Sequence, residues 1–416
     1  MAASKGRWRV FLLCALLFIL SQFYRTSSAV IAPDLEQEFS LSSTQLGILG
    51  AAFFYAFAIS QIPTGLLIDR KGPRLTMTVL SVLAAIGSCV FAIASDFRTV
   101  LMGRILLGIG MAGNLMGSMA LIGNWFERNR FATLSGAMLA LGTIGNTLST
   151  SPLAYVSKMV GWRSTFLALG VLTFLLSFLF FLSVKDSPNP ERAKNKEFQA
   201  HFSVKKALLH LFGDRNYWLI SAGTFLRYGT FAAIQSLWAG PYLIKQHGLS
   251  AVTAGNILLL LNIGLIVGSP LGGWFCETVI KSTRKTVIIG LGGLSFFQAA
   301  LGMYELGGKV SILGMLFWGV GFFGGFGIIM YAHIKELMPD QITGTALTGV
   351  NLFTMLGAAV FIHGLGSLID RMSLVAQGAG YSRAFLVCGL SAFLGMVLYF
   401  FTSEGEKGRK DIQQDC

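Results

Sequence analysis

The chain has 416 residues, of which 54% are hydrophobic and only 12% are charged. An average soluble domain carries about 25% charged residues, so a water-soluble enzyme or binding domain of this length is excluded. The net charge is +13, but the basic residues stand in short runs between apolar segments, and no nucleic-acid partner is expected. The five cysteines are scattered without metal-binding spacing, and we expect neither a metal nor another cofactor.

Long apolar stretches follow one another along the whole chain. About 20 helical residues cross the hydrocarbon core of a bilayer, and twelve stretches reach this length. They lie at roughly 9–31, 45–68, 74–95, 99–124, 131–156, 164–184, 216–243, 251–276, 285–304, 310–332, 342–366 and 383–402. The sequence therefore predicts an all-α membrane protein with six-helix bundles at residues 1–184 and 216–403, a cytoplasmic linker at 185–215 and a cytoplasmic tail at 404–416.

The loop charges predict the orientation. With both termini inside, the inner segments hold 22 Lys and Arg residues and the outer loops hold 7. Positive residues are retained on the cytoplasmic side of a membrane. We therefore expect a multi-pass protein with the N and C termini in the cytoplasm and the lipid bilayer as its main surroundings. The inner (cytoplasmic) membrane of a bacterium is the expected location, and a eukaryotic membrane is the alternative.

The two halves of the chain echo each other. Residues 23–26 (FYRT) in the first span correspond to residues 225–228 (FLRY) in the seventh, and residues 65–69 (GLLID) correspond to residues 273–277 (GWFCE). Transporters are often built from such repeats, with the substrate site near the bilayer midplane where the repeats meet. The pattern predicts pseudo-symmetry between the two bundles.

A family resemblance rests on residues 65–74 (GLLIDRKGPR), which are similar to the signature loop between spans 2 and 3 of the major facilitator superfamily. The span-4 residues 104–110 (RILLGIG) resemble a second motif of that family. The resemblance covers essentially the whole chain and implies the major facilitator fold and secondary transport by rocker-switch alternating access. It also implies a cytoplasmic conformational latch formed by Gly65, Asp69, Arg70, Gly72 and Arg74.

Three arginines lie deep in the apolar spans, where ionisable groups are costly and informative: Arg25, Arg104 and Arg227. Arg25 and Arg227 hold equivalent places in the two halves, so we expect them to face each other across a central cavity. Two guanidinium groups there favour an anion, because arginine binds carboxylate or phosphate with two parallel hydrogen bonds. Alternatively, each arginine binds main-chain carbonyls or extends to the membrane surface. Arg104 has either a structural or a coupling role.

The paired arginines resemble those of the organic phosphate branch of the superfamily, and the first half also resembles the anion–cation symporter branch. The resemblance implies a substrate site containing arginines of spans 1 and 7, with polar and aromatic neighbours. The substrate-binding candidates are Arg25, Arg227, Tyr24, Tyr228, Gln235, Tyr55 and Asn351. About half of the polar residues within the spans are expected to join helices rather than to touch a ligand.

The coupling mechanism stays open. Many symporters of this branch carry an acidic residue where this chain has Tyr24, and Glu where it has Met111. The absence of both acids disfavours simple proton symport, and coupling to protons or sodium, exchange against a counter-anion and facilitated diffusion are alternatives. His333 and His363 can titrate near neutral pH, but each is also a candidate for a coupling or purely structural hydrogen-bonding role.

We therefore expect a carrier of a small organic anion, such as a carboxylate, phosphate or sulfonate, working as a monomer. The alternative is a carrier of a neutral or larger metabolite, a siderophore or a drug. A membrane enzyme or a transporter-like sensor is the third hypothesis. The sequence contains no nucleotide-binding GxxxxGK[ST] loop, HExxH or GxSxG motif, and no enzymatic activity is expected.

Overall fold

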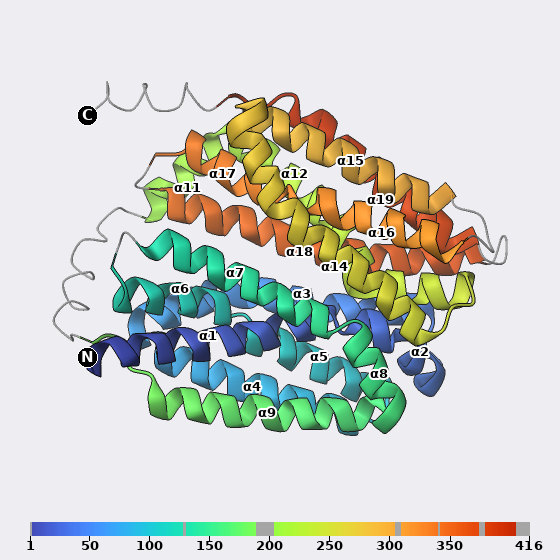
Figure 1. Cartoon of the computed structure of the whole chain (residues 1–416), viewed down its shortest axis with the longest axis horizontal. Coiled ribbons are helices and arrows are strands. Elements are labelled where there is room, and N and C mark those ends of the chain that lie inside the picture. Colours follow the sequence, from blue (N-terminus) through green and yellow to red (C-terminus); the bar gives the residue numbers. More distant parts are fainter. Residues whose placement is uncertain are drawn as a thin grey trace. The chain divides into compact units, whose positions relative to one another are not determined.

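The computed structural model describes residues 2–127, 130–188, 204–303, 309–339, 342–373 and 379–404. Every regular element in these ranges is helical. The helices before residue 189 are α1 (Ala2–Thr26), α2 (Ser28–Phe39), α3 (Ser43–Lys71), α4 (Pro73–Ile93), α5 (Phe97–Met111), α6 (Asn114–Trp125), α7 (Phe131–Leu148), α8 (Ser151–Val160) and α9 (Trp162–Ser183), as Figure 1 shows.

The second part of the chain is also helical, with several π-helical turns, which are labelled η. Its elements are α11 (Val204–Gly213), α12 (Arg215–Ala233), η2 (Ile234–Trp238), α13 (Ala239–Pro241), η3 (Tyr242–Gln246), α14 (Ala251–Trp274), η4 (Phe275–Ile280), α15 (Thr283–Met303), α16 (Val310–Gly325), α17 (Ile328–Leu337), α18 (Thr343–Ser373) and α19 (Ala379–Tyr399). Among the described residues, ten helices, counting adjoining pieces together, are long and apolar enough to cross a membrane. The other two expected spans, 131–156 and 216–243, are interrupted in the structure: the first between α7 and α8, and the second by π-helical turns after α12.

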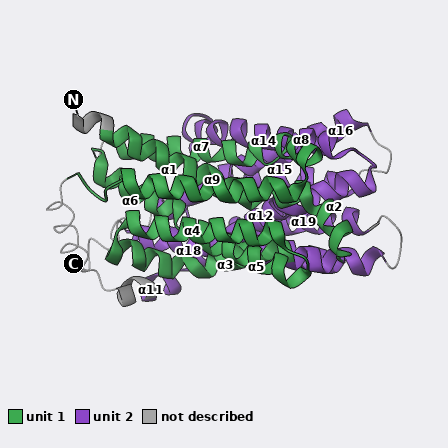
Figure 2. Ribbon diagram, turned by 90° about the horizontal axis from the view of Figure 1, so that it is seen from below, with its two compact units in different colours: residues 1–41, 49–201 green, residues 42–48, 202–416 purple. Residues whose placement is uncertain are grey.

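The chain divides into two compact units, each of which packs mainly against itself (Figure 2). Unit 1 consists of Met1–Leu41 and Leu49–His201, and unit 2 consists of Ser42–Ile48 and Phe202–Cys416. The first turns of α3 therefore belong to unit 2, although the rest of this helix belongs to unit 1. About half of the predicted linker (residues 189–203) and nearly all of the predicted tail (residues 405–416) lie outside the described residues.

The outer faces of several helices are apolar, as a bilayer requires. On α9 the exposed large side chains are Leu167, Val171, Leu172, Phe174, Leu175, Phe178, Leu179 and Leu182. An apolar stripe of this length is unusual for a protein surface in water, where large exposed patches mark contact with another apolar phase. The stripe fits contact with lipid chains along the full length of the helix.

Glycines bring helices close together within each unit. In unit 2, a Cβ atom added at Gly264 or Gly268 of α14 would meet main-chain atoms of α16, and one added at Gly321 or Gly325 of α16 would meet main-chain atoms of α14. Both pairs have the four-residue spacing that allows two membrane helices to pack backbone against backbone. Close backbone approach replaces the hydrophobic driving force, which is weak between helices in lipid.

Candidate functional site

Arg25 lies in the last turn of α1 and is the most accessible of the three intramembrane arginines. Its guanidinium carbon is 4.8 Å from the centroid of the Phe57 ring of α3, in the same unit. The residue is half-buried, whereas Arg104 and Arg227 are buried. Part of the Arg25 side chain is therefore exposed, although the rest of the span is apolar.

Arg104 lies inside unit 1, fully buried on α5. Its Nη1 donates a hydrogen bond of 3.1 Å to the main-chain carbonyl of Tyr24, and its guanidinium carbon is 5.2 Å from the centroid of the Phe53 ring. Tyr24 is also buried, and its hydroxyl is 3.1 Å from the hydroxyls of both Ser88 and Thr173. In this structure Tyr24 thus joins α1 to α4 and α9, and Arg104 joins α5 to α1.

Arg227 points into the interior of unit 2. Its Nη2 donates to the carbonyl of Gly324 at the end of α16, and its guanidinium touches the position of a Cβ at Gly327, between α16 and α17. The Tyr228 ring centroid lies 5.9 Å from the guanidinium carbon. A cavity of ≈ 10 Å³ beside Arg227 is about large enough for one water. The interruption between α16 and α17 therefore supplies a carbonyl acceptor for this charge.

Two further candidates belong to polar groups of unit 2. Gln235, in the π-helical turn η2, is buried and donates a hydrogen bond of 2.8 Å to Asn262 of α14. The Tyr331 hydroxyl donates to Asn351 Oδ1 at 3.2 Å and lies 3.0 Å from the Thr354 hydroxyl. Gln235 and Asn351 thus each lie next to a second polar residue that could share a ligand with them.

The remaining substrate-binding and coupling candidates, Tyr55, His333 and His363, differ in burial. Tyr55 and His363 are half-buried, whereas His333 of α17 is fully buried. The Nε2 atom of His333 is 3.0 Å from the Ser403 carbonyl, and its Nδ1 atom is 2.7 Å from the Tyr399 hydroxyl. A carbonyl only accepts, so Nε2 carries the proton and Nδ1 accepts from Tyr399. Both nitrogens of the neutral ring are therefore occupied in linking α17 to α19 and the residues after it.

The predicted latch loop joins α3 to α4. Gly72 has a φ of +85°, which favours glycine, and Arg74, two residues further on, donates its backbone N–H to Asp186 at 2.7 Å. The Arg74 guanidinium donates two hydrogen bonds to the Phe181 carbonyl. Asp69 and Arg70 are exposed at the end of α3. Within unit 1, the second half of the loop is thus anchored on the end of α9.

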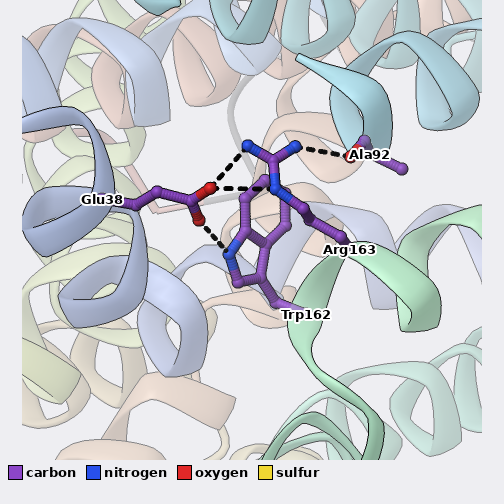
Figure 3. Close-up of polar contacts among 4 residues, drawn as sticks. All are labelled: Glu38, Ala92, Trp162 and Arg163. Carbon is purple, nitrogen blue, oxygen red and sulfur yellow. Dashed lines mark hydrogen bonds and ion pairs between the residues drawn. The ribbon is translucent and has the colours of Figure 1, made fainter. Parts of the chain in front are cut away.

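A polar cluster lies at the start of α9, whereas the latch loop is anchored at the end of this helix, and Figure 3 shows the contacts of the cluster. Glu38 of α2 accepts from Trp162 Nε1 at 2.8 Å and forms an ion pair of 2.6 Å with Arg163 of α9, whose Nη1 also donates to the carbonyl of Ala92. A cavity of ≈ 370 Å³ adjoins the cluster and is lined in part by Asp34. Partial burial and the charge of Glu38 raise the pKa of Asp34. Among the described residues, no group of three or more His, Cys, Asp or Glu could hold a metal ion.

Sequence reasoning did not predict several residues that contact the candidate residues in the structure. Phe57 contacts Arg25, Asn262 contacts Gln235, and Asp186 anchors the latch loop. Only Asp186 carried a usable signal, as an isolated acid directly after an apolar span. The other two look like ordinary span residues, because their roles depend on which helix face meets which neighbour.

Comparison with known families decides the class of the protein. The model of the Major Facilitator Superfamily matches residues 12–362. This chain belongs to the major facilitator superfamily. The predicted fold class is therefore confirmed: the chain is an all-α, multi-pass membrane protein with the twelve-helix fold of that superfamily, and it is a secondary transporter.

Relatives resemble this superfamily member over nearly its whole length. It is 25% identical to the hexuronate transporter of Bacillus subtilis, over 96% of this chain and 95% of that protein. It is 25% identical to the D-galactonate transporter of Escherichia coli O6:H1, over 96% of both. It is 24% identical to the probable hexose phosphate transport protein of Chlamydia trachomatis, over 95% of this chain and 91% of that protein.

Among solved structures, the crystal structure of the D-xylose–proton symporter superimposes with a TM-score of 0.78 at 18% sequence identity. The match covers 96% of this chain and 99% of that chain. At this identity the likeness is one of fold.

Proposed function

We propose that this superfamily member transports a small organic anion by rocker-switch alternating access, and that Arg25 binds the anionic group. The observation that carries the proposal is the contrast between the three intramembrane arginines. Arg104 and Arg227 are buried inside their units, whereas Arg25 is half-buried with its guanidinium against an aromatic face. A partly exposed arginine in an apolar span is suited to bind a carboxylate, phosphate or sulfonate.

The relatives support the same class of substrate. Hexuronate, galactonate and hexose phosphate are all organic anions, and a carboxylate or phosphate group is what they share. Tyr228, Gln235, Tyr55 and Asn351 stay candidates for contacts with the rest of the substrate. That Arg25 and Arg227 bind the same anion stays a prediction. Arg227 would then have to release its hydrogen bond to the Gly324 carbonyl in order to bind the substrate.

The proposal also includes the orientation in the membrane, the conformational latch, and the oligomeric state with the coupling ion. The excess of Lys and Arg in the predicted inner segments supports cytoplasmic termini, and the bacterial relatives support an inner membrane. The exposed Asp69 and Arg70 at the end of α3, beside the anchored Gly72 and Arg74, support a conformational latch in this loop. We assign the protein to a monomeric state and leave the coupling ion open between a proton, sodium and a counter-anion.

A ligand screen tests the substrate class. Ligands that bind the native state raise its melting temperature. We would measure the melting of detergent-purified protein with D-galactonate, D-glucuronate, glucose 6-phosphate and sulfoacetate, and with galactose and glucose as neutral counterparts. An anion should stabilise the wild type but not Arg25→Ala, and Arg98→Ala, which removes an exposed arginine at the start of α5, should respond like the wild type. Stabilisation by the neutral sugars alone would overturn the proposal in favour of a neutral substrate. An equal response of Arg25→Ala to an anion would overturn the role of Arg25 in binding.

A further inference from the structure

Two rings of α3 stand between two positive charges of unit 1. The Phe53 and Phe57 rings stack with centroids 6.0 Å apart and planes at 25°. The Arg104 guanidinium carbon is 5.2 Å from the centroid of Phe53, and that of Arg25 is 4.8 Å from the centroid of Phe57. The order along the stack is thus Arg104, Phe53, Phe57, Arg25.

The surrounding packing holds this stack in place. Phe53 is fully buried and Phe57 is 5% exposed. Gly108, one turn after Arg104 on α5, lies so close to α3 that an added Cβ would meet the Phe53 carbonyl and Ala56. This close approach of α5 to α3 brings the Arg104 side chain over the ring of Phe53.

The guanidinium of Arg104 also holds the main chain next to Arg25. Arg104 donates to the Tyr24 carbonyl, which belongs to the peptide bond that joins Tyr24 to Arg25. The side chain of Tyr24 is held at its hydroxyl by Ser88 and Thr173. The backbone of Arg25 is therefore fixed from one side by Arg104, and its long side chain extends from this point to the ring of Phe57.

A long side chain in an apolar span has several rotamers, and fixing one of them costs conformational entropy. The face of an aromatic ring attracts a cation, and the attraction is larger where water is excluded. Contact with Phe57 therefore favours one orientation of the Arg25 guanidinium.

We propose that Phe57 is a positioning residue for the substrate-binding arginine: its ring, supported by Phe53, pre-orients the Arg25 guanidinium for an incoming anion. This inference rests on the proposed function of Arg25. Phe57 itself needs no polar contact with the substrate, because its effect passes through Arg25. Pre-orientation lowers the ordering cost that binding would otherwise incur.

Graded fluorination of one ring tests the electrostatic part of the inference. Fluorine atoms withdraw charge from the ring face and weaken a cation–π contact with little change in shape. We would place 4-fluoro-, 3,5-difluoro- and 3,4,5-trifluorophenylalanine at position 57 of the full chain by stop-codon suppression. The control is the same series at Phe91, a fully buried ring of unit 1 whose aromatic neighbours are Trp162 and Phe166.

The first readout needs no substrate. Phenylglyoxal modifies arginine side chains, so its rate at Arg25, followed by peptide mass spectrometry, reports how firmly the ring at position 57 holds the guanidinium. We expect the rate to rise stepwise with fluorine content at position 57, by roughly 3- to 30-fold in total, and to stay constant in the position-91 series. Phe57→Leu should match the trifluoro protein, and Phe57→Trp should restore the slow rate. A flat series at position 57, or an equal slope at position 91, would overturn the inference.

A second readout separates this inference from the proposed function. D-galactonate binding to the position-57 series should weaken in the same order as the labelling rate rises. If Arg25→Ala abolishes binding while the fluorinated series binds like the wild type, only the positioning role of Phe57 fails. If Arg25→Ala binds D-galactonate as well as the wild type does, the proposed function of Arg25 fails, whatever the labelling rates show.

Discussion

The carboxylate of Asp370 accepts a hydrogen bond from the backbone N–H of Thr44, with 2.7 Å between Oδ2 and the nitrogen. Its other oxygen accepts from the N–H of Ser43 at 2.9 Å. Asp370 lies near the end of α18, more than 300 residues along the chain, yet it satisfies two of the N–H groups that have no acceptor within α3. The contact explains why the first turns of α3 belong to unit 2.

Replacing Asp370 by alanine should lower the free energy of unfolding by about 1–2 kcal/mol, because two N–H groups lose a charged acceptor at a helix N-terminus. Asp370→Asn should lie between the two proteins, since one oxygen and no charge remain. Thermal melting in detergent measures the change. Arg371→Gln, at the exposed neighbouring position, serves as the control and should melt like the wild type. Equal melting of Asp370→Ala and the wild type would contradict the role of this contact.

Asp34→Asn should stabilise the protein at neutral pH. The pKa of Asp34 is raised by burial and by the charge of Glu38, so ionised Asp34 is less favourable in the folded than in the unfolded chain. The advantage of asparagine should shrink as the pH falls through the raised pKa and vanish below the ordinary Asp value of about 3.9. Melting temperatures between pH 8 and pH 3.5 measure the difference.

Asp96→Asn should have the opposite effect to Asp34→Asn and destabilise the protein at neutral pH. Hydrogen bonds from Thr99 and Arg98 lower the pKa of Asp96, which caps α5. Asp96 therefore stabilises the fold above the ordinary Asp pKa, and this contribution is lost as the pH falls through the lowered value. The asparagine variant should melt lower than the wild type at neutral pH. If both substitutions changed the melting temperature at neutral pH in the same direction, the electrostatic reasoning would be wrong for at least one of them.

Two glycines of α7 should respond differently to alanine. A Cβ at Gly145 would meet the carbonyl of Ile19 on α1, whereas no atom of the described residues lies within 4 Å of a Cβ added at Gly136. Gly145→Ala should lower the free energy of unfolding by about 1–3 kcal/mol through overpacking. Gly136→Ala should leave it unchanged or raise it by up to ~1 kcal/mol, because alanine favours a helix. Comparable melting of the two variants would mean that α1 and α7 can separate at little cost.

Arg104→Lys should be more damaging to stability than Arg104→Met. Lysine retains the cost of a buried charge but lacks the planar guanidinium that contacts Phe53 and the Tyr24 carbonyl, whereas methionine fills similar space without the charge. Melting temperatures test the order. Transport in proteoliposomes adds a second test: a methionine variant that retains exchange but loses uphill uptake would assign Arg104 to coupling, and loss of both activities would assign it to the support of Arg25.

The class of the protein and the places where charge enters the membrane follow from the amino-acid sequence alone. Span length and the high cost of a charge in lipid are properties of local composition, so the apolar stretches and the embedded Arg25, Arg104 and Arg227 could be recognised without a structure. The loop at residues 65–74 indicated the superfamily, which the family comparison confirmed.

The contacts of each embedded arginine, in contrast, depend on how the helices pack. Arg227 meets the carbonyl of Gly324, Arg104 meets that of Tyr24, and Arg25 meets the ring of Phe57. The three residues have the same side chain and similar apolar neighbours in the sequence. Their surroundings differ because helix rotation and close packing at Gly108 and Gly327 bring distant segments together, and these depend on the whole bundle rather than on any one span.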